Sequence, residues 1–81
     1  MIEVEYKPEF LKIIGKLDNF VKEKVKKQVA KIINNPERGK PMMHERKGTR
    51  ELYIKPFRLS YAYLKKENKI IFLDLYHKDK Q

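Results

Sequence analysis

The segment from residue 51 to residue 78 most constrains the fold, because its apolar side chains alternate with polar ones in three successive runs. The runs cover residues 51–55, 58–63 and 70–76, and the pairs Pro56-Phe57 and Glu67-Asn68 separate them. Alternation with a period of two residues is typical of strands that have one buried face. We therefore expect three strands joined by two tight turns, which makes neighbouring strands antiparallel.

Successive side chains of a strand point to opposite faces of the sheet, so the alternation assigns each residue to a face. The predicted core face is apolar and aromatic and carries Leu52, Ile54, Leu59, Tyr61, Tyr63, Ile71, Leu73 and Leu75. The predicted open face carries mainly cations and tyrosines, namely Tyr53, Lys55, Arg58, Ser60, Tyr76 and Lys78. An apolar face must be covered by other elements, whereas a face of cations and tyrosines suits an anionic partner.

The first half of the chain supplies the cover for the core face. Residues 2–6 alternate and predict a short strand, and the apolar residues between positions 10 and 33 recur at helical spacing. This periodicity permits one long helix, but Gly15 and the Asp18-Asn19 pair favour two helices packed as a hairpin. Residues 34–49, which prolines and glycines punctuate, are expected to form the one long loop.

The predicted fold is α+β, in a single domain that spans residues 1–81. It consists of a short N-terminal strand, a two-helix hairpin and a three-stranded antiparallel meander with the helices on one face. The opposite face of the sheet is left open.

Charge is the most informative feature of the composition. The 20 Lys and Arg residues against 11 Asp and Glu residues give a formal net charge of +9. A domain this basic is drawn to phosphate backbones or to acidic proteins, although lysine enrichment for solubility alone is the alternative interpretation. The chain has no cysteine, no apolar run long enough to span a membrane and no signal segment, so we expect a cytoplasmic location.

Several common catalytic arrangements are missing from the sequence. The three glycines are scattered, so there is no phosphate-binding loop, and the two histidines, His44 and His77, lack the spacing of a zinc site. We therefore expect no metal and no cofactor. The remaining candidate site is cationic and combines Lys55, Arg58 and Lys78 with Tyr53, Tyr76 and His77.

These residue types suit the cleavage of RNA, which carries its own nucleophile in the 2′-hydroxyl group. Cleavage then needs a general base, stabilisation of the phosphorane and a proton for the leaving 5′ oxygen. Lys55 is a candidate base, Arg58 would hold the phosphoryl oxygens, and either Lys78 or His77 would be the acid. Strand alternation places His77 opposite Lys78, so both serve one site only if the strand end twists or bulges.

Four segments together resemble the RelE/ParE superfamily of toxins. They are the loop motif 38–41 (RGKP), the strand 50–55 (RELYIK), the strand 57–61 (FRLSY) and the terminal segment 76–80 (YHKDK). The resemblance covers essentially the whole chain and implies a type II toxin that cleaves mRNA in the ribosomal A site. It also implies an acidic cognate antitoxin of the RelB kind, with a heterotetramer as one possible assembly.

The resemblance assigns roles residue by residue. The RelE branch implies catalytic roles for Lys55, Arg58 and Lys78, with His77 where other branches place a catalytic histidine. The RNA-binding residues are expected to be basic or aromatic, namely Lys40, Arg46, Lys47, Arg50, Tyr53 and Tyr76.

Three departures from the RelE pattern concern the site. Tyr53 stands where RelE has the first of two strand lysines, and the tyrosine expected in the C-terminal tail is missing. No acidic residue lies clearly at the position where some branches carry a glutamate base, although Glu45 and Glu51 are nearby. A DNA gyrase inhibitor of the ParE kind and a non-catalytic basic nucleic-acid-binding module are the alternative functions.

Overall fold

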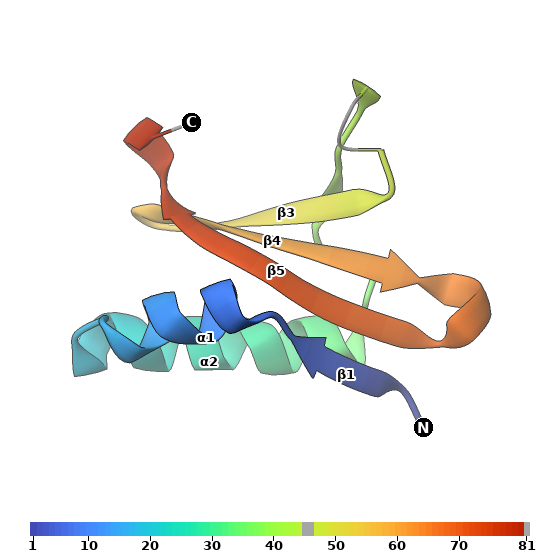
Figure 1. Cartoon of the computed structure of the whole chain (residues 1–81), viewed down its shortest axis with the longest axis horizontal. Coiled ribbons are helices and arrows are strands. Elements are labelled where there is room, and N and C mark those ends of the chain that lie inside the picture. The colour runs from blue at the N-terminus through green and yellow to red at the C-terminus, as the bar shows by residue number, and fades with distance from the viewer. Residues whose placement is uncertain (45–46, 81) are drawn as a thin grey trace.

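The computed structural model describes residues 1–44 and 47–80, and the helices and strands follow the predicted order (Figure 1). Strand β1 (Glu3–Tyr6) leads into helices α1 (Pro8–Gly15) and α2 (Asn19–Asn34). The short strand β2 (Lys40–Pro41) precedes β3 (Thr49–Ile54), β4 (Phe57–Leu64) and β5 (Lys69–His77). The α+β prediction is thereby confirmed.

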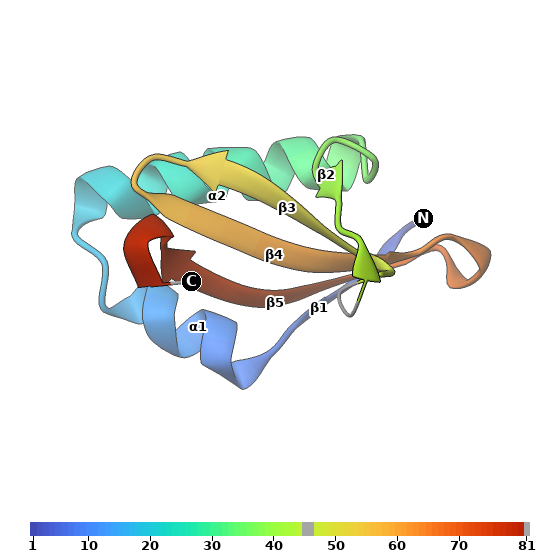
Figure 2. The same cartoon turned by 90° about the horizontal axis from the view of Figure 1, so that it is seen from above.

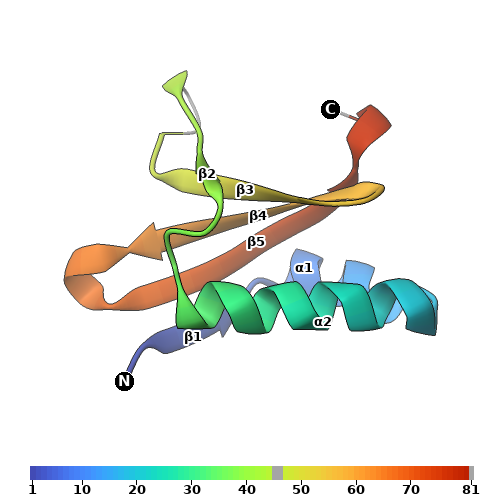
Figure 3. The ribbon, with the colours of Figure 1, turned by 180° about the vertical axis from the view of Figure 1, so that it is seen from behind.

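The five strands form one sheet in the order β1-β5-β4-β3-β2. Strand β1 runs parallel to β5, and the other neighbours are antiparallel. Both helices cover the same face of the sheet, and the other face is open (Figure 3). Seen from above, α2 runs beside β3 and α1 beside β5 (Figure 2).

The break between the helices is where the sequence predicts it. Helix α1 ends at Gly15, and Asp18 caps α2 by accepting a hydrogen bond from the Val21 amide at 2.9 Å. A side-chain acceptor at this position satisfies one of the amides that a helix start leaves unpaired. A single continuous helix would lack this cap, and it could not fold back to cover the sheet.

One part of the loop prediction is wrong. Within residues 34–49, Lys40 and Pro41 form an edge strand that pairs with Glu51 and Arg50 of β3. A two-residue strand has no periodicity to detect, because its partner rather than its own sequence defines it. This pairing brings the basic loop to the side of the sheet.

The core lies between the helices and the covered face of the sheet. Nine apolar or aromatic side chains are buried there: Phe10, Val25, Ile32, Ile54, Leu59, Tyr61, Ile70, Phe72 and Leu75. Tyr61, which we expected in the core, is fully buried, and Tyr63 is half-buried against the core cluster. The faces predicted for β3 and β4 are therefore those observed.

The predicted faces of β5 are wrong for Ile71 and Leu73. The buried residues are Ile70 and Phe72, because a bulge between Ser60 and Tyr61 of β4 leaves Leu73 as an extra residue in β5. An extra residue reverses the alternation, and Leu75 returns to the core face beyond it. Before the bulge, apolar residues stand at both even and odd positions of β5. Alternation alone therefore does not show which of the two sets is buried.

The two isoleucines at the start of β5 provide a matched test of this assignment. Ile70→Ala removes a fully buried side chain and should lower the free energy of unfolding by about 2–5 kcal/mol. Ile71→Ala should cost clearly less, because Ile71 is only half-buried. Urea unfolding followed by circular dichroism measures both, and an equal or larger loss for Ile71→Ala would contradict the observed register.

Candidate functional site

A buried tyrosine holds the loop that leads into β2. The Tyr61 hydroxyl donates a hydrogen bond to the Pro36 carbonyl and accepts one from the Gly39 amide, each at 2.8 Å. A Cβ atom at Gly39 would lie 2.8 Å from both the ring and the hydroxyl of Tyr61, so only glycine fits. Burial raises the pKa of Tyr61 and keeps the hydroxyl protonated as a donor.

Arg50 secures the same loop from β3. Its Nη1 atom donates to the carbonyl of Gly39 at 2.8 Å and to that of Glu37 at 3.1 Å. The Arg50 side chain is only 22% exposed, and its Nη2 atom lies 4.0 Å from the Glu37 carboxylate. The predicted RNA-binding arginine is therefore engaged with the loop backbone, and it lies on the core face beside Tyr61.

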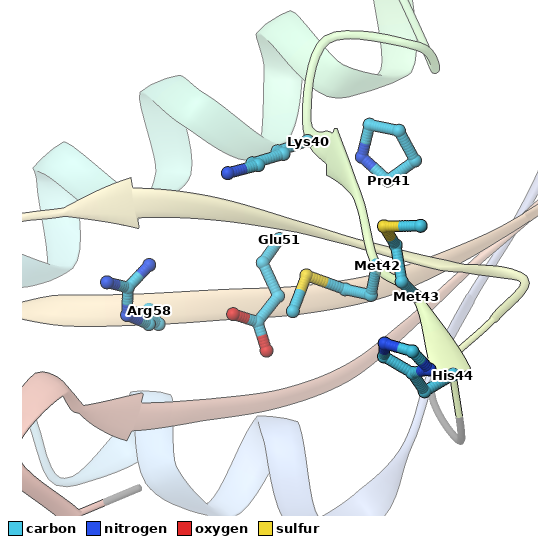
Figure 4. Close-up of a pocket in the computed structure, with 7 residues that line it drawn as sticks. All are labelled: Lys40, Pro41, Met42, Met43, His44, Glu51 and Arg58. Carbon is cyan, nitrogen blue, oxygen red and sulfur yellow. The ribbon is translucent and has the colours of Figure 1, made fainter.

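The anchored loop forms one wall of a pocket of about 430 Å³ on the open face. Loop residues 40–44 line it together with Glu51 of β3 and Arg58 of β4 (Figure 4). The close-up shows the Glu51 carboxylate between the Arg58 guanidinium and the Met42 side chain. The pocket thus places a carboxylate and a guanidinium beside two thioethers and an imidazole.

The observed open face can be read from the strand register. It carries Lys40, Glu51, Tyr53, Arg58, Ser60, Asp74 and Tyr76, which pair across β2, β3, β4 and β5. Two segments rise above this face, the stretch that follows β2 and the C-terminal turn Lys78–Lys80 (Figures 1 and 3).

Glu51 is the buried carboxylate of the site, with 7% of its surface exposed. The Tyr76 hydroxyl donates a 2.7 Å hydrogen bond to its Oε2 atom from across β4. Glu51 pairs with Ser60 on one side and with Lys40 on the other. A carboxylate held in this way is oriented and can accept a proton inside the pocket.

Arg58 lies between two tyrosines in the register, opposite Tyr53 on β3 and Tyr76 on β5. Its Cζ atom lies 5.5 Å from the centroid of the Tyr53 ring, and the Lys78 Nζ atom lies at the same distance from that ring. Among the described residues, the buried Nε atom of Arg58 has no hydrogen-bond partner. A buried donor without a partner is unusual in a folded protein.

Arg58, Lys78, Tyr53 and Tyr76 are therefore brought together on the open face to which the strand pattern assigned them, and Lys40, predicted as a loop residue, joins them from β2. The sequence interpretation missed the pocket residues Met42, Met43 and His44, and it left Glu51 unassigned. Alternation on β3 already places Glu51 on the face of Tyr53, whereas no local signal indicates that residues 42–44 lie beside it.

His77 is not part of this group. It pairs with Phe57, and the two rings meet edge-on with centroids 5.7 Å apart. Its Nδ1 atom accepts a hydrogen bond from the Asp79 amide at 3.2 Å and lies 3.8 Å from the Asp79 carboxylate. Phe57 packs against the core cluster, so the ring of His77 lies on the covered side of the strand end.

The remaining predicted residues lie at the margins. Lys55 is exposed in the turn after β3, before the cis peptide bond to Pro56, and its carbonyl accepts a hydrogen bond from Lys24 Nζ at 3.1 Å. Lys47 is exposed in the turn that leads into β3. Arg46 and Glu45 lie outside the described residues.

Within residues 1–44 and 47–80, no helix has the length and apolarity needed to cross a membrane. In the same residues, no three or more histidine, aspartate or glutamate side chains are grouped so that they could hold a metal ion.

Comparisons with known proteins give one family and several similar folds. Residues 4–81 match the family described as the ParE toxin of type II toxin-antitoxin system, parDE. No curated protein sequence matches the chain.

Solved structures of similar fold include proteins of Escherichia coli and Mycobacterium tuberculosis. The intact Escherichia coli RelBE toxin–antitoxin complex matches at 15% identity and a TM-score of 0.81, over 95% of this chain and 96% of that one. The RelBE2 complex of Mycobacterium tuberculosis matches at 22% identity and a TM-score of 0.83, over 95% of this chain and 98% of that one. YafQ of E. coli matches at 20% identity and a TM-score of 0.74, over 98% of this chain and 96% of that one.

The hydroxyl of Tyr61 provides a test of the loop anchor. Tyr61→Phe removes both loop hydrogen bonds and leaves the Gly39 amide and Pro36 carbonyl to find other partners. The free energy of unfolding should fall by about 1–3 kcal/mol. Amide hydrogen exchange should also speed up at Gly39.

Tyr63→Phe is the matched control, because it removes a hydroxyl from the same face of β4 and keeps both loop bonds. Equal exchange rates at Gly39 in Tyr61→Phe and in the unmodified chain would show that Tyr61 does not hold the loop.

Proposed function

We propose that this chain, which belongs to the ParE toxin family of type II toxin–antitoxin systems, is a toxin that cuts mRNA on the ribosome. The observation that carries this proposal is the pocket in which the oriented carboxylate of Glu51 and the guanidinium of Arg58 lie on one face. Such a pair supplies a base and an anion-binding group, which are the two functions that RNA cleavage by the 2′-hydroxyl needs first.

The reaction begins when Glu51 takes the proton of the ribose 2′-hydroxyl. The 2′ oxygen then attacks the adjacent phosphorus, and a pentacoordinate phosphorane forms. Arg58 stabilises its extra negative charge, because the guanidinium offers fixed, charged donors and Arg58 lines the pocket. The bond to the 5′ oxygen breaks, which leaves a 2′,3′-cyclic phosphate and a 5′-hydroxyl end.

The leaving 5′ oxygen needs a proton, and we assign this role to Lys78. Its ammonium group lies over the Tyr53 ring on the open face, beside Arg58. His77 is the less suitable donor, because its ring contacts Phe57 on the covered side. Lys55 is likewise a less suitable base than Glu51, since it lies in an exposed turn and does not line the pocket.

The charge of the chain is consistent with binding on the ribosome. A net charge of +9 attracts the toxin to RNA, and the cations Lys40, Arg58 and Lys78 lie on the open face. Lys40 lines the pocket, and Lys47 is exposed in the turn that leads into β3. We infer that both contact phosphates of the message.

A second candidate function is inhibition of DNA gyrase. The family match favours it, because the matching family is the ParE toxin and gyrase is the target that a resemblance to ParE implies. In this function the open face would bind a protein, and the placement of Glu51 and Arg58 in one pocket would have no chemical task.

We also propose an acidic antitoxin as the partner of the chain. The similar E. coli and M. tuberculosis structures are complexes of a toxin with its antitoxin. A toxin with a charge of +9 is complemented by an acidic inhibitor, and like-charged competitors would be repelled.

Replacement of Arg58 tests the main function. Arg58→Ala should lower mRNA cleavage by about 100-fold or more, because it removes the group that stabilises the phosphorane. Primer extension on messages from cells that briefly express the chain measures discrete cuts that depend on translation. Arg38→Ala is the control, since Arg38 bonds Gln28 at 3.3 Å and does not line the pocket.

Intact messages in growth-arrested cells that express the unmodified chain would contradict cleavage. A supercoiling assay with purified gyrase would then test the second candidate directly.

The choice of base is tested separately. Glu51→Gln keeps the shape of the side chain and removes its basicity, so cleavage should slow by about 10²- to 10⁴-fold. Lys55→Ala should stay within a few-fold of the unmodified chain in the same assay. The reverse ranking of the two variants would make Lys55 the base, and Glu9→Gln on α1 controls for loss of an exposed carboxylate.

A further inference from the structure

We propose that Met42 is an oxidation site through which a peroxide switches the pocket off. The inference rests on the proposed cleavage of RNA and adds a form of regulation to the same site. The site consists of the Met42 thioether and the Glu51 carboxylate toward which it points (Figure 4).

The oxidisable sulfur of this chain is gathered at the pocket. The sequence has no cysteine and three methionines, which are Met1, Met42 and Met43. A cysteine thiolate is the side chain that a peroxide ordinarily attacks first, and without one the reaction falls on the thioethers. Met42 and Met43 both line the pocket, so two of the three sulfurs lie beside the proposed reaction site.

The two pocket methionines are consecutive, and their side chains point in different directions. The Met42 amide donates a 3.0 Å hydrogen bond to the Thr49 carbonyl, so the backbone at Met42 is held beside β3. Met42 is half-buried and points toward Glu51, whereas Met43 is 73% exposed and points away from it (Figure 4). The fixed backbone therefore presents one thioether to the carboxylate and the other to solvent.

Oxidation by hydrogen peroxide is a two-electron reaction at the sulfur. A lone pair of the Met42 sulfur attacks one peroxide oxygen, an S–O bond forms, and the O–O bond breaks. The attacked oxygen gives up its proton and the leaving oxygen takes one up, so the peroxide is reduced to water. The product is methionine sulfoxide, in which a polar group has replaced an apolar thioether.

The sulfoxide conflicts with the carboxylate in the pocket. Its oxygen carries partial negative charge and only accepts hydrogen bonds, so it is repelled by Glu51, which is 7% exposed. The repulsion is relieved when the sulfoxide turns toward the cations Lys40 and Arg58, which line the same pocket. These are the groups that the proposed reaction uses for phosphate, and oxidation therefore lowers cleavage.

Peroxide treatment of the purified chain tests this inference. Catalase removes the peroxide, cleavage of a defined message on ribosomes is compared with that by untreated protein, and peptide mass spectrometry measures oxygen added at each methionine. Cleavage should fall by about 5- to 100-fold, in line with the cost of a polar group buried without a partner. Methionine sulfoxide reductases, which reduce the two epimers of the product, should restore it.

Two substitutions assign the effect to one sulfur, and each variant is compared with its own untreated sample. Met42→Leu keeps an apolar side chain of similar size without sulfur, so treatment should change its cleavage by less than about twofold. Met43→Leu is the matched control, because Met43 is the exposed neighbour in the same loop. It should lose cleavage on treatment as the chain without substitutions does.

The possible results separate this inference from the function on which it rests. Complete sulfoxide at Met42 with cleavage unchanged would overturn the switch and leave RNA cleavage standing. Equal loss in Met42→Leu, or no oxygen added at Met42 under conditions that oxidise Met43, would also overturn it. An untreated chain that cuts no message would overturn both proposals.

Discussion

The anchoring of the loop by Tyr61 is the interaction on which the site depends. A buried hydroxyl without partners would cost free energy, and here the Pro36 carbonyl and the Gly39 amide supply both partners. Because Gly39 has no Cβ atom, the loop backbone can approach the ring closely enough for these bonds. The chain beyond Gly39 is thereby directed along β3, where Lys40 pairs with Glu51. The same contact that completes the core therefore builds one wall of the pocket.

The bulge in β5 connects the core to the other side of the pocket. Without the extra residue at Leu73, strict alternation from Phe72 would place Tyr76 on the covered face. With it, Leu75 fills the core and Tyr76 reaches the open face, where its hydroxyl orients the carboxylate of Glu51. Bulges commonly redirect a side chain next to a functional site, and in this chain the redirected group is a hydrogen-bond donor. The same shift in alternation puts His77 on the covered face, where its ring meets that of Phe57.

Much of the fold could be predicted because its signals are local. Alternation identified three of the five strands as a meander, Gly15 and Asp18 marked the break between the helices, and Tyr61 was expected in the core. The grouping of Arg58 with Tyr53 and Tyr76 was also predictable, since cross-strand neighbours follow from a tight turn between adjacent strands. These inferences need only the two-residue period of a strand and the hydrogen bonding of a helix cap.

The errors and omissions share a physical cause, which is dependence on residues far away in the chain. Apolar residues in both phases of early β5 left two registers open, and the bulge opposite β4 selects the one that buries Ile70 and Phe72. The pairing of β2 with β3 likewise depends on loop anchors contributed by β3 and β4, so nothing within residues 40–44 indicates it. Sequence periodicity thus specified the strands of the meander and the polarity of their faces. Packing and hydrogen bonds between distant segments placed Glu51 in a pocket with Arg58, because such contacts form only when the whole sheet is assembled.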